Sequence, residues 1–378
     1  MPYWRLSSFY LFYFAVLGIL VPYWGFYLKY LEFDALAIGQ LMAIPMATKF
    51  IAPNIWGWLG DHFGRRMRIV QLASFISMLI FLLIFVVEGF WQLAIAMMLF
   101  SFFWNASLPQ FEVVTLAYLK ERVREYSRVR VWGSVGFILS VLLLGELIDR
   151  YSVMIVPYAL FLVYLAIWIS SMTVADIATP HHDDNDLNFS GLLKQPAIIA
   201  FFVYCFLNQF GHGVYYAFYS IFMEDHGYSK SLIGILWATG VIAEVVIFIS
   251  MHRLLQRFGA GKIMFVSLLL AAARWLLIGH FPENLTILFS AQLLHAASFG
   301  TFHAAAVHIV HSAFRGRHSG RGMALYSSLS FGLGGALGSL MAGHLWEQAG
   351  PLLTFWIAAV VSFAAALICW RWHDKAYD

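Results

Sequence analysis

The chain has 378 residues, of which 61% are hydrophobic and 11% are charged, and its mean hydropathy is +0.76. Because an ordinary soluble domain carries about 25% charged residues, this composition excludes a soluble enzyme, a nucleic-acid-binding protein and a secreted disulfide scaffold. The 23 basic and 20 acidic residues nearly balance, which argues against a polyanionic partner. The composition predicts an all-α membrane protein, since twelve helices of about 20 residues would use about two-thirds of such a chain.

Twelve apolar segments long enough to cross a bilayer follow one another along the chain. The first lacks an A-x-A cleavage site, so we expect it to be a span and not a signal peptide. A polar linker at 175–195 separates six spans from six and predicts an N-terminal lobe over 1–174 and a C-terminal lobe over 196–378. The predicted spans are 7–28, 37–58, 69–87, 91–118, 128–148, 154–174, 196–222, 230–254, 262–280, 284–311, 321–346 and 350–370.

The basic residues predict the orientation, because an even number of spans places both termini on one side. Lys49 and Arg274 lie inside spans, and Lys29, Arg150 and Lys230 lie on the side opposite the termini. The other 18 basic residues lie on the side of the termini. The positive-inside rule therefore predicts that both termini are cytoplasmic.

The two halves repeat one another at an offset of 195 residues. The sequence Ala-Ile-Gly-Gln-Leu-Met-Ala at 37–43 corresponds to Leu-Ile-Gly-Ile-Leu-Trp-Ala at 232–238, and Phe63-Gly64 corresponds to Phe258-Gly259. A parallel repeat of this kind is typical of two-lobed transporters. It predicts two six-helix lobes related by a pseudo-twofold axis, with a substrate site between them near mid-membrane.

Four charged residues, Lys49, Glu112, Glu244 and Arg274, lie inside apolar spans. Each costs about 2.5–3.5 kcal/mol at the centre of a bilayer on an insertion scale, so each must face protein or a wet cavity. Two interpretations stay open. The charges form a substrate or proton pathway, or they form ion pairs that only join helices.

Glu244 is the candidate proton carrier. The 195-residue offset places Lys49 and Glu244 at equivalent positions of the two lobes, and we expect both to face a central cavity. Trp237 and Gly240 share a helical face with Glu244, so its carboxylate is expected in a partly desolvated site where it can bind and release a proton. The alternative is a carboxylate permanently paired with Arg274 or Lys49.

Histidines and aromatic residues complete the candidate site. His295, deep in the tenth span, suits a proton relay, although membrane histidines also serve as packing residues. Interfacial belts and helix packing are the alternative explanation for the rings. No complete catalytic or metal-ligand set is found, so no enzyme activity, cofactor, metal or disulfide is expected. The candidate substrate-binding residues with polar or aromatic side chains are Trp24, Tyr27, Asn208, Tyr215, Trp237 and His303.

The loop after the second span reads GWLGDHFGRR at 57–66. It matches the G-x-x-x-D-[RK]-x-G-[RK]-[RK] loop of the major facilitator superfamily, except that His62 stands where a basic residue is usual. Glycines allow a tight turn, and an acidic residue here can cap a helix or pair with a base as a latch between conformations. The gating candidates are Gly57, Asp61, Gly64 and Arg65.

Within that superfamily the chain resembles the lactose permease group and is most similar to the 3-phenylpropionic acid transporter family. The resemblance implies the major facilitator fold and covers nearly the whole length. Its stretches are 21–24, 130–135, 227–231, 236–244, 274–275 and 294–303.

In lactose permease an acidic residue and an arginine 18 residues later bind the sugar, and the resemblance places Glu112 and Arg130 at these positions. Arg274 and His295 match the arginine and the histidine of the permease's proton-coupling group.

Two departures from the permease change the expected coupling. The permease's glutamate of the eighth span falls on Val241, one helical turn before Glu244. Ser298 replaces the carboxylate that follows the matching histidine. Proton coupling would therefore use Glu244, together with His295.

We therefore expect a monomeric, proton-coupled secondary transporter of the bacterial inner membrane that imports a small organic solute by alternating access. Its partners would be the solute, protons and the lipid bilayer, and no nucleic acid. The resemblance implies an aromatic carboxylate such as 3-phenylpropionate, which Lys49 or Arg274 could hold. A sugar or nucleoside symporter that uses Glu112 and Arg130, and an efflux transporter, remain as alternatives.

Overall fold

The computed structural model describes residues 2–177, 189–314 and 318–372 of the 378-residue chain. Every regular element within these ranges is helical. Residues 178–188 of the linker expected at 175–195, and residues 373–378 of the expected C-terminal lobe, lie outside the described part. Eleven of the described helices are long and apolar enough to cross a membrane.

The helices agree with the expected spans to within a few residues. The short helix α7 within the expected linker was not predicted. The N-terminal half contains α1 Tyr3–Tyr30, α2 Ala35–Phe63, α3 Arg66–Phe81 with η1 Leu82–Phe85, α4 Phe90–Leu119, η2 Lys120–Glu125, α5 Tyr126–Arg150 and α6 Ile155–Met172. The C-terminal half contains α7 Phe189–Leu193, α8 Pro196–Asp225, α9 Lys230–Phe258, α10 Ala260–His280, α11 Leu285–His295, η3 Ala296–Thr301, α12 Phe302–Ala313, α13 His318–Ser327, η4 Ser328–Gly334, α14 Gly335–Gln348 and α15 Gly350–Trp372.

Local capping explains where α2 and α9 begin and where α2 ends. The Asp34 side chain accepts a hydrogen bond from the backbone N–H of Ala37 at 2.7 Å, and Ser229 accepts one from Leu232 at 3.2 Å. Such N-caps satisfy backbone donors that the first turn of a helix leaves free. Gly64 ends α2 with a φ of +62°, a left-handed conformation that glycine adopts without steric penalty.

The eleventh expected span, 321–346, is interrupted in the structure. It runs through α13, the π-helical segment η4 and α14, and neither flanking α-helix reaches 18 residues. This segment is the expected span that is absent from the eleven candidates. The tenth span also contains a π-helical segment, η3, directly after His295. Short π-helical segments are rare and often occur at functional sites.

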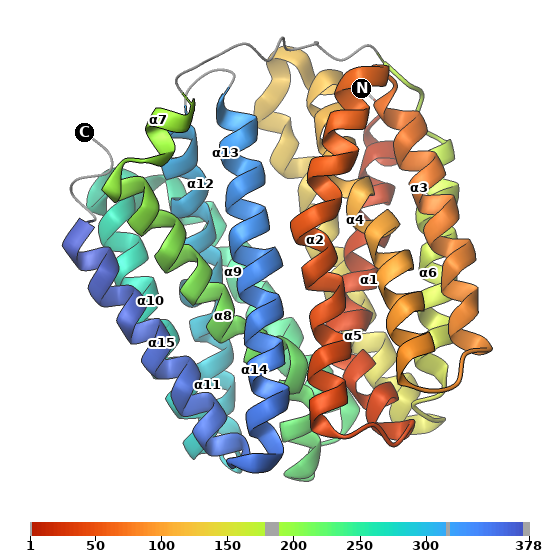
Figure 1. Ribbon diagram of the computed structural model, residues 1–378, viewed down its shortest axis with the longest axis vertical. Coiled ribbons are helices and arrows are strands. Elements are labelled where there is room, and N and C mark those ends of the chain that lie inside the picture. Colours follow the sequence, from red (N-terminus) through yellow and green to blue (C-terminus); the bar gives the residue numbers. More distant parts are fainter. Residues whose placement is uncertain (1, 178–188, 315–317, 373–378) are drawn as a thin grey trace.

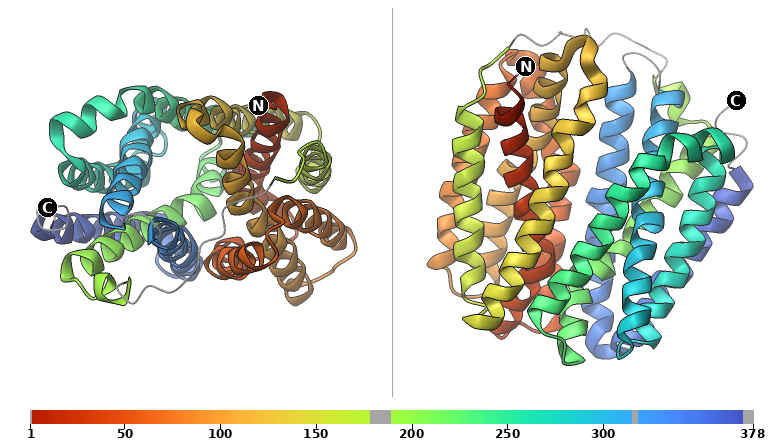
Figure 2. Two further views of the ribbon diagram at one scale, coloured as in Figure 1. Left: turned by 90° about the horizontal axis from the view of Figure 1, so that it is seen from above. Right: turned by 180° about the vertical axis from the view of Figure 1, so that it is seen from behind.

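The helices form two groups that lie side by side. Helices α1 to α6 occupy one side of the molecule and α8 to α15 the other (Figure 1), and the view from above separates the same groups (Figure 2). Helix α1 begins and α15 ends at the same end of the bundle, here called the terminal end; the other is the distal end. The chain thus has the major facilitator fold, with twelve membrane-crossing segments.

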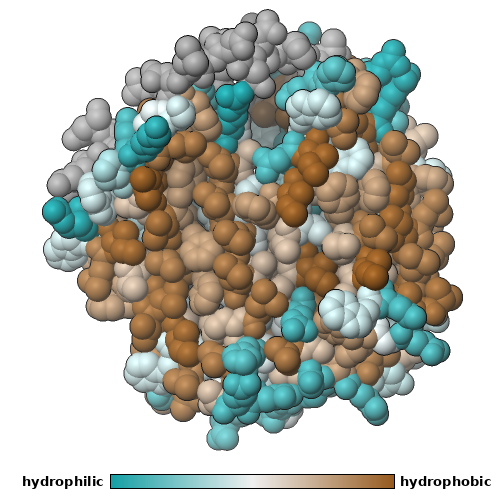
Figure 3. Space-filling model, viewed as in Figure 1, coloured by the Kyte–Doolittle hydropathy of each residue, from teal (hydrophilic) through white to brown (hydrophobic). Residues whose placement is uncertain are grey.

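The molecular surface agrees with a membrane environment. Figure 3 shows a broad apolar band around the middle of the molecule, with hydrophilic residues gathered towards the two ends. Large apolar side chains are highly exposed on the surface, such as Ile249 on α9 and Val360 on α15. A soluble protein rarely exposes so large a continuous apolar area, so this surface indicates a multi-pass membrane protein.

The two halves touch most closely near the distal end. A Cβ atom built on Gly39 of α2 would lie 2.6 Å from the Cα atom of Gly343 of α14, so only glycine permits this approach. On the other side of the interface, a Cβ on Gly234 of α9 would lie 2.4 Å from the carbonyl oxygen of Val141 of α5. Close backbone contacts on both sides of the interface therefore close the distal end.

Polar contacts across the halves reinforce this closure. Asp149, near the end of α5, accepts hydrogen bonds from the backbone N–H groups of Lys230 at 2.9 Å and Ser231 at 2.7 Å, at the start of α9. Lys29 of α1 pairs with Glu224 of α8 at 2.9 Å. A carboxylate at a helix N-terminus and an ion pair both favour the arrangement in which the distal end is closed.

Replacing Asp149 with Asn should weaken this closure. The carboxylate interaction with the start of α9 contributes about 0.3–1 kcal/mol at an exposed helix terminus, so we expect a shift of about two- to fivefold towards a distally open state. Labelling of an introduced cysteine by a membrane-impermeant thiol reagent would measure the shift. Glu283→Gln, which removes an acidic residue of the α10–α11 turn, is the matched control. Equal labelling of the two variants would contradict a closing role for Asp149.

Candidate functional site

A charged cluster of the N-terminal half forms around Glu112 of α4 and Arg130 of α5. The Arg130 Nε atom lies 4.0 Å from Glu112 Oε1, and both side chains are about one-third exposed. The Tyr126 hydroxyl donates a hydrogen bond to the same Glu112 oxygen at 3.2 Å, and the Arg130 guanidinium lies 3.8 Å from the ring centre of Phe14. The structure therefore places the two residues at the permease's sugar-binding positions next to each other, with accessible polar atoms.

Lys49 of α2 belongs to the same cluster but lies over an aromatic ring of the other half. Its Nζ atom is 5.1 Å from the ring centre of Phe331 in η4, and the side chain is half-buried. Among the described residues, no carboxylate forms an ion pair with Lys49. Electrostatic interactions connect Lys49 with Glu112 and Arg130. Two cations and one carboxylate leave this cluster with one excess positive charge.

The C-terminal half buries a carboxylate–imidazole pair. Glu244 of α9 is 9% exposed, and its Oε1 atom lies 2.8 Å from Nε2 of His295, the last residue of α11. Two glycines make room for the pair. A Cβ on Gly240 would lie 3.2 Å from the His295 ring, and a Cβ on Gly300 would lie 3.2 Å from Cγ of Glu244. Glu244 thus faces its own half and pairs with neither Arg274 nor Lys49.

Arg274 of α10 is fully buried beside this pair. Its guanidinium donates to the carbonyl of Ala291 at 3.0 Å and to the side-chain oxygen of Gln292 at 3.2 Å, and it lies 4.2 Å from the ring centre of Tyr215. The Tyr215 hydroxyl donates to the same Gln292 oxygen at 2.9 Å. Within the described part of the chain no carboxylate pairs with Arg274, so its charge is balanced by dipoles and rings.

Aromatic rings from η3, η4 and α12 form a cluster next to Lys49. Phe331 of η4 lies 5.9 Å from Phe299 of η3 and 5.6 Å from His303, between ring centres. His303 and the Tyr326 hydroxyl are hydrogen-bonded at 3.0 Å. Phe299, His303 and Phe331 are half-buried, so part of each ring remains accessible at the interface.

Several predicted substrate-binding residues are instead buried between the helices. Trp24 and Tyr27 of α1 contact each other, with ring centres 4.9 Å apart, and both are buried. Trp237 packs on Tyr215 at 4.4 Å. The Asn208 side chain donates to the carbonyl of Ser298 in η3 at 3.3 Å. Of the predicted binding residues, the structure leaves Lys49, Glu112, Arg130 and His303 partly exposed and buries these others. The buried Trp237 also contacts Phe137 of the N-terminal half, with ring centres 6.4 Å apart.

Sequence reasoning missed four residues of the site: Tyr126, Gln292, Phe299 and Phe331. Gln292 lies three residues before His295, so helical periodicity could have placed it beside the expected proton group. Tyr126 precedes Arg130 by one turn and could have been found in the same way. Phe331 stands in a glycine-rich apolar stretch and carries no comparable signal.

The predicted gating residues lie at the terminal end, away from the charged clusters. Asp61 pairs with Arg66, the first residue of α3, and not with Arg65. The Arg66 guanidinium also donates to the Gln110 side chain of α4 at 2.5 Å. A Cβ atom on Gly57 would meet nothing within 4 Å. The loop is thus tied to its own half in this conformation.

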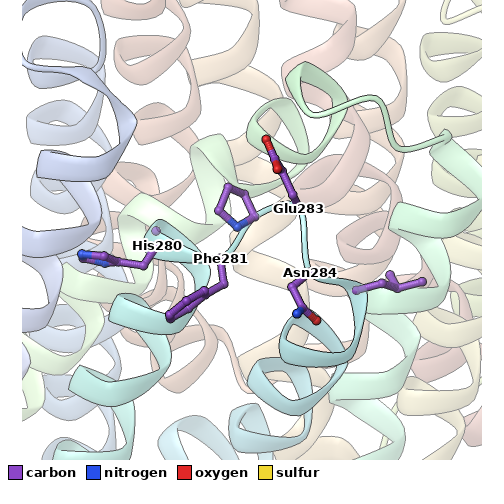
Figure 4. A pocket seen from close by; sticks show the side chains of 7 residues that line it. His280, Phe281, Glu283 and Asn284 are labelled. Carbon is purple, nitrogen blue, oxygen red and sulfur yellow. The ribbon is translucent and has the colours of Figure 1, made fainter.

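A depression of about 710 Å³ lies at the turn between α10 and α11 near the distal end, lined by residues 279–285. Figure 4 shows the side chains of His280, Glu283 and Asn284 pointing in different directions around it. The depression contains none of the buried charged residues, and we do not assign it to the site.

Comparisons with known proteins agree with this fold. The chain is 27% identical over 370 residues to the probable 3-phenylpropionic acid transporter of Escherichia coli K12, covering 94% of each chain. It is 25% identical over 380 residues to the maltose permease of Geobacillus stearothermophilus, covering 96% of this chain and 94% of that one.

A solved structure and a family model extend the comparison. The crystal structure of the nucleoside transporter NupG superposes with a TM-score of 0.84 at 18% identity, over 99% of this chain and 100% of that one. At that identity the likeness concerns the fold alone. The model of the MFS_1-like family matches residues 3–357. The chain therefore belongs to the MFS_1-like family and is a major facilitator superfamily transporter.

Proposed function

We propose that this transporter is a proton-coupled symporter that imports an aromatic carboxylate such as 3-phenylpropionate across the bacterial inner membrane. It would act as a monomer with lobes over 1–174 and 196–378 and with both termini in the cytoplasm. One arrangement carries the proposal. A carboxylate suited to proton binding, Glu244, is buried in one half, and a cation without a carboxylate partner among the described residues, Lys49, faces the interface from the other half.

The excess positive charge of the N-terminal cluster supports an anionic substrate. Charges near the membrane centre are costly unless they are paired, and a substrate carboxylate would compensate Lys49. The ring of Phe331 lies beside Lys49, and the rings of Phe299 and His303 contact Phe331, so together they offer an apolar surface for an aromatic group. The Escherichia coli relative, a probable 3-phenylpropionic acid transporter, agrees with this chemistry.

Glu244 supports the coupling step. Proton binding would remove its negative charge and alter the contact with His295, 2.8 Å away. A proton on Glu244 and an anion at Lys49 together would leave fewer uncompensated charges at the interface, and the halves could then rock past one another. Coupled symport requires that the fully loaded and the empty transporter change between their two open states more easily than the partly loaded transporter does.

A second candidate is a sugar or nucleoside symporter. The accessible Glu112–Arg130 pair offers acceptors and donors for hydroxyl groups. Relatives or structural neighbours are named as a maltose permease and a nucleoside transporter. A neutral substrate would leave the Lys49 charge uncompensated, and for this reason we favour the carboxylate.

The experiment is a measurement of internal pH in proteoliposomes after addition of 3-phenylpropionate, with maltose, lactose and a nucleoside added in parallel. Acidification beyond that of protein-free liposomes, which accounts for passive entry of the neutral acid, is expected only with 3-phenylpropionate. Acidification only with a sugar or nucleoside would select the second candidate. Substrate uptake by inverted but not right-side-out vesicles would indicate efflux.

Replacing Lys49 with Gln should weaken binding of the aromatic acid. Loss of a partly buried charge pair costs about 1–3 kcal/mol, so the KM for 3-phenylpropionate should rise about 5- to 100-fold. Lys49→Arg, which keeps the charge, is the matched control and should lie close to wild type. Counterflow of labelled substrate measures both variants without a proton gradient. An unchanged KM in Lys49→Gln would show that the substrate carboxylate binds elsewhere.

A further inference from the structure

A group of buried polar atoms in the C-terminal half, behind the Glu244–His295 pair, lacks hydrogen-bond partners. They come from α8, α10, α11 and η3. Among the described residues, the unpartnered donors are Nη1 of Arg274, Nε2 of Gln292 and Oγ of Ser298. The unpartnered acceptors are Oδ1 of Asn208, Nε2 of His212 and Nδ1 of His295, and Oε1 of Glu244 on α9 also lacks a hydrogen-bond partner.

The residues that carry these atoms are neighbours. The ring centres of His212 and His295 lie 6.0 Å apart, and the His212 ring lies 5.0 Å from that of Trp275, next to Arg274. Asn208 bonds the backbone of Ser298, and Gln292 bonds Arg274. His212, Arg274 and Gln292 are fully buried. These residues therefore form one contiguous buried group, here called the enclosed region.

The nearest polar contacts of the two histidines indicate which ring nitrogen remains available. His212 Nδ1 lies 2.9 Å from the carbonyl oxygen of Asn208, which can only accept, so Nδ1 carries the hydrogen and Nε2 is an acceptor in the neutral ring. His295 Nε2 faces the Glu244 carboxylate at 2.8 Å, so Nδ1 is likewise the free acceptor in the neutral ring. Each histidine thus presents a bare nitrogen to the enclosed region.

We propose that this region is a water site and that its water joins His212 to the Glu244–His295 pair. Buried polar groups in proteins are almost always satisfied by protein or by ordered water. Water both donates and accepts hydrogen bonds, so it can satisfy the unpartnered donors and the unpartnered acceptors of this group. A small anion would satisfy only the donors and would be repelled by the two bare histidine nitrogens.

The water site deepens the proposed function, on which its role in coupling rests. A proton on His295 can pass through hydrogen-bonded water to Nε2 of His212, whose Nδ1 proton is held by the Asn208 carbonyl. His212 is then a positioning and relay residue behind the pair that binds the proton. The groups that face this region are Glu244 on α9, Arg274 on α10, His295 on α11, and His212, Tyr215 and Tyr216 on α8.

X-ray radiolytic footprinting in ¹⁸O-labelled water tests the site without reference to transport, because side chains beside bound water are oxidised even when buried. We expect oxidation of the peptides that contain His212, Trp275 and His295, with isotope exchange slower than at exposed residues. His212→Phe, which fills the space with an apolar ring, should lower oxidation at Trp275 and His295 at least fivefold. No oxidation of these peptides in the wild-type protein would overturn the proposal. A thermal stability that depends on chloride in the wild-type protein, but not in Arg274→Gln, would also overturn it, because it would indicate a site for a small anion.

Transport measurements then test the relay. His212→Phe should lower proton-driven accumulation of 3-phenylpropionate at least tenfold and leave counterflow within about twofold, whereas His212→Gln, which keeps a polar atom for water, should lose less. Full accumulation by His212→Phe would overturn the relay. If the wild-type protein moves no protons, the proposed function fails, while the footprint still decides whether the water site exists.

Discussion

Glu244→Gln is expected to abolish proton-driven accumulation of substrate while substrate exchange continues. Glutamine has nearly the shape of glutamate and can still bond His295, which lies 2.8 Å from the native carboxylate. It cannot bind and release a proton near neutral pH, so a proton gradient no longer drives net uptake. We expect the accumulation ratio to fall at least tenfold, to the level of equilibration, and counterflow to remain within about threefold of wild type.

Two measurements on the same preparation separate coupling from binding. Uptake under an imposed pH gradient reports coupling, and counterflow at equal pH reports binding and exchange. Glu88→Gln, which neutralises an exposed carboxylate of the loop before α4, is the matched control and should behave as wild type. Gradient-driven uptake by Glu244→Gln at the wild-type level would show that another group carries the proton.

The membrane environment explains why so much of the fold could be predicted. A chain in lipid must satisfy its backbone hydrogen bonds within each segment, so an apolar segment of sufficient length directly predicts a helix. The interruption of the eleventh segment could not be predicted in this way. Its glycines, including Gly332 and Gly334 within η4, allow a π-helical segment but do not require one. Hydropathy reports length and polarity and carries no information on hydrogen-bond register.

Individual residues of the candidate site could be predicted from the sequence, but the contacts between them could not. The cost of a charge in lipid identified Lys49, Glu244 and Arg274 without structural knowledge. The repeat placed Lys49 and Glu244 at equivalent positions, yet their surroundings differ, because Lys49 contacts Phe331 at the interface and Glu244 is buried against His295. Equivalent positions share depth, whereas the contact each side chain makes depends on the packing of its own half.

The aromatic surface beside Lys49 was even harder to predict from the sequence. A π-helical turn contains an extra residue, so side chains after it are rotated relative to the regular 3.6-residue period. Phe299 and Phe331 both lie in such segments, η3 and η4. A sequence reading based on the regular period therefore places these two rings on the wrong faces, and their meeting at the interface becomes evident only from the structure.

Gly39→Val is expected to hold the distal end open and to lower transport at least tenfold. A Cβ atom at Gly39 would lie 2.6 Å from the Cα atom of Gly343 and 2.8 Å from the carbonyl oxygen of Ser339. These are backbone atoms of α14, so no side-chain rotation can relieve the clash. Overpacking of this kind costs about 1–3 kcal/mol, and only conformations in which the distal end is closed bear that cost.

Cysteine labelling from the distal side measures the shift. Met46 contacts Gly335 and Ser339 across the same interface, and the two native cysteines are buried, so Met46→Cys is a suitable reporter. A membrane-impermeant thiol reagent should label it about 5- to 100-fold faster in Gly39→Val than in the glycine background, in line with that energy. Leu36→Phe, which enlarges an exposed side chain near the same end of α2, is the control and should leave labelling unchanged.

The outcome distinguishes a moving interface from a static one. If the halves rock, Gly39→Val traps the distally open state, in which labelling rises while substrate still binds from that side. If the helices only part locally to accept the extra methyl groups, labelling rises little and transport continues, and the glycine contact is then not part of the transport cycle. Because the contact joins backbone to backbone, local accommodation would have to move α2 or α14 as a whole, and we therefore expect the first result.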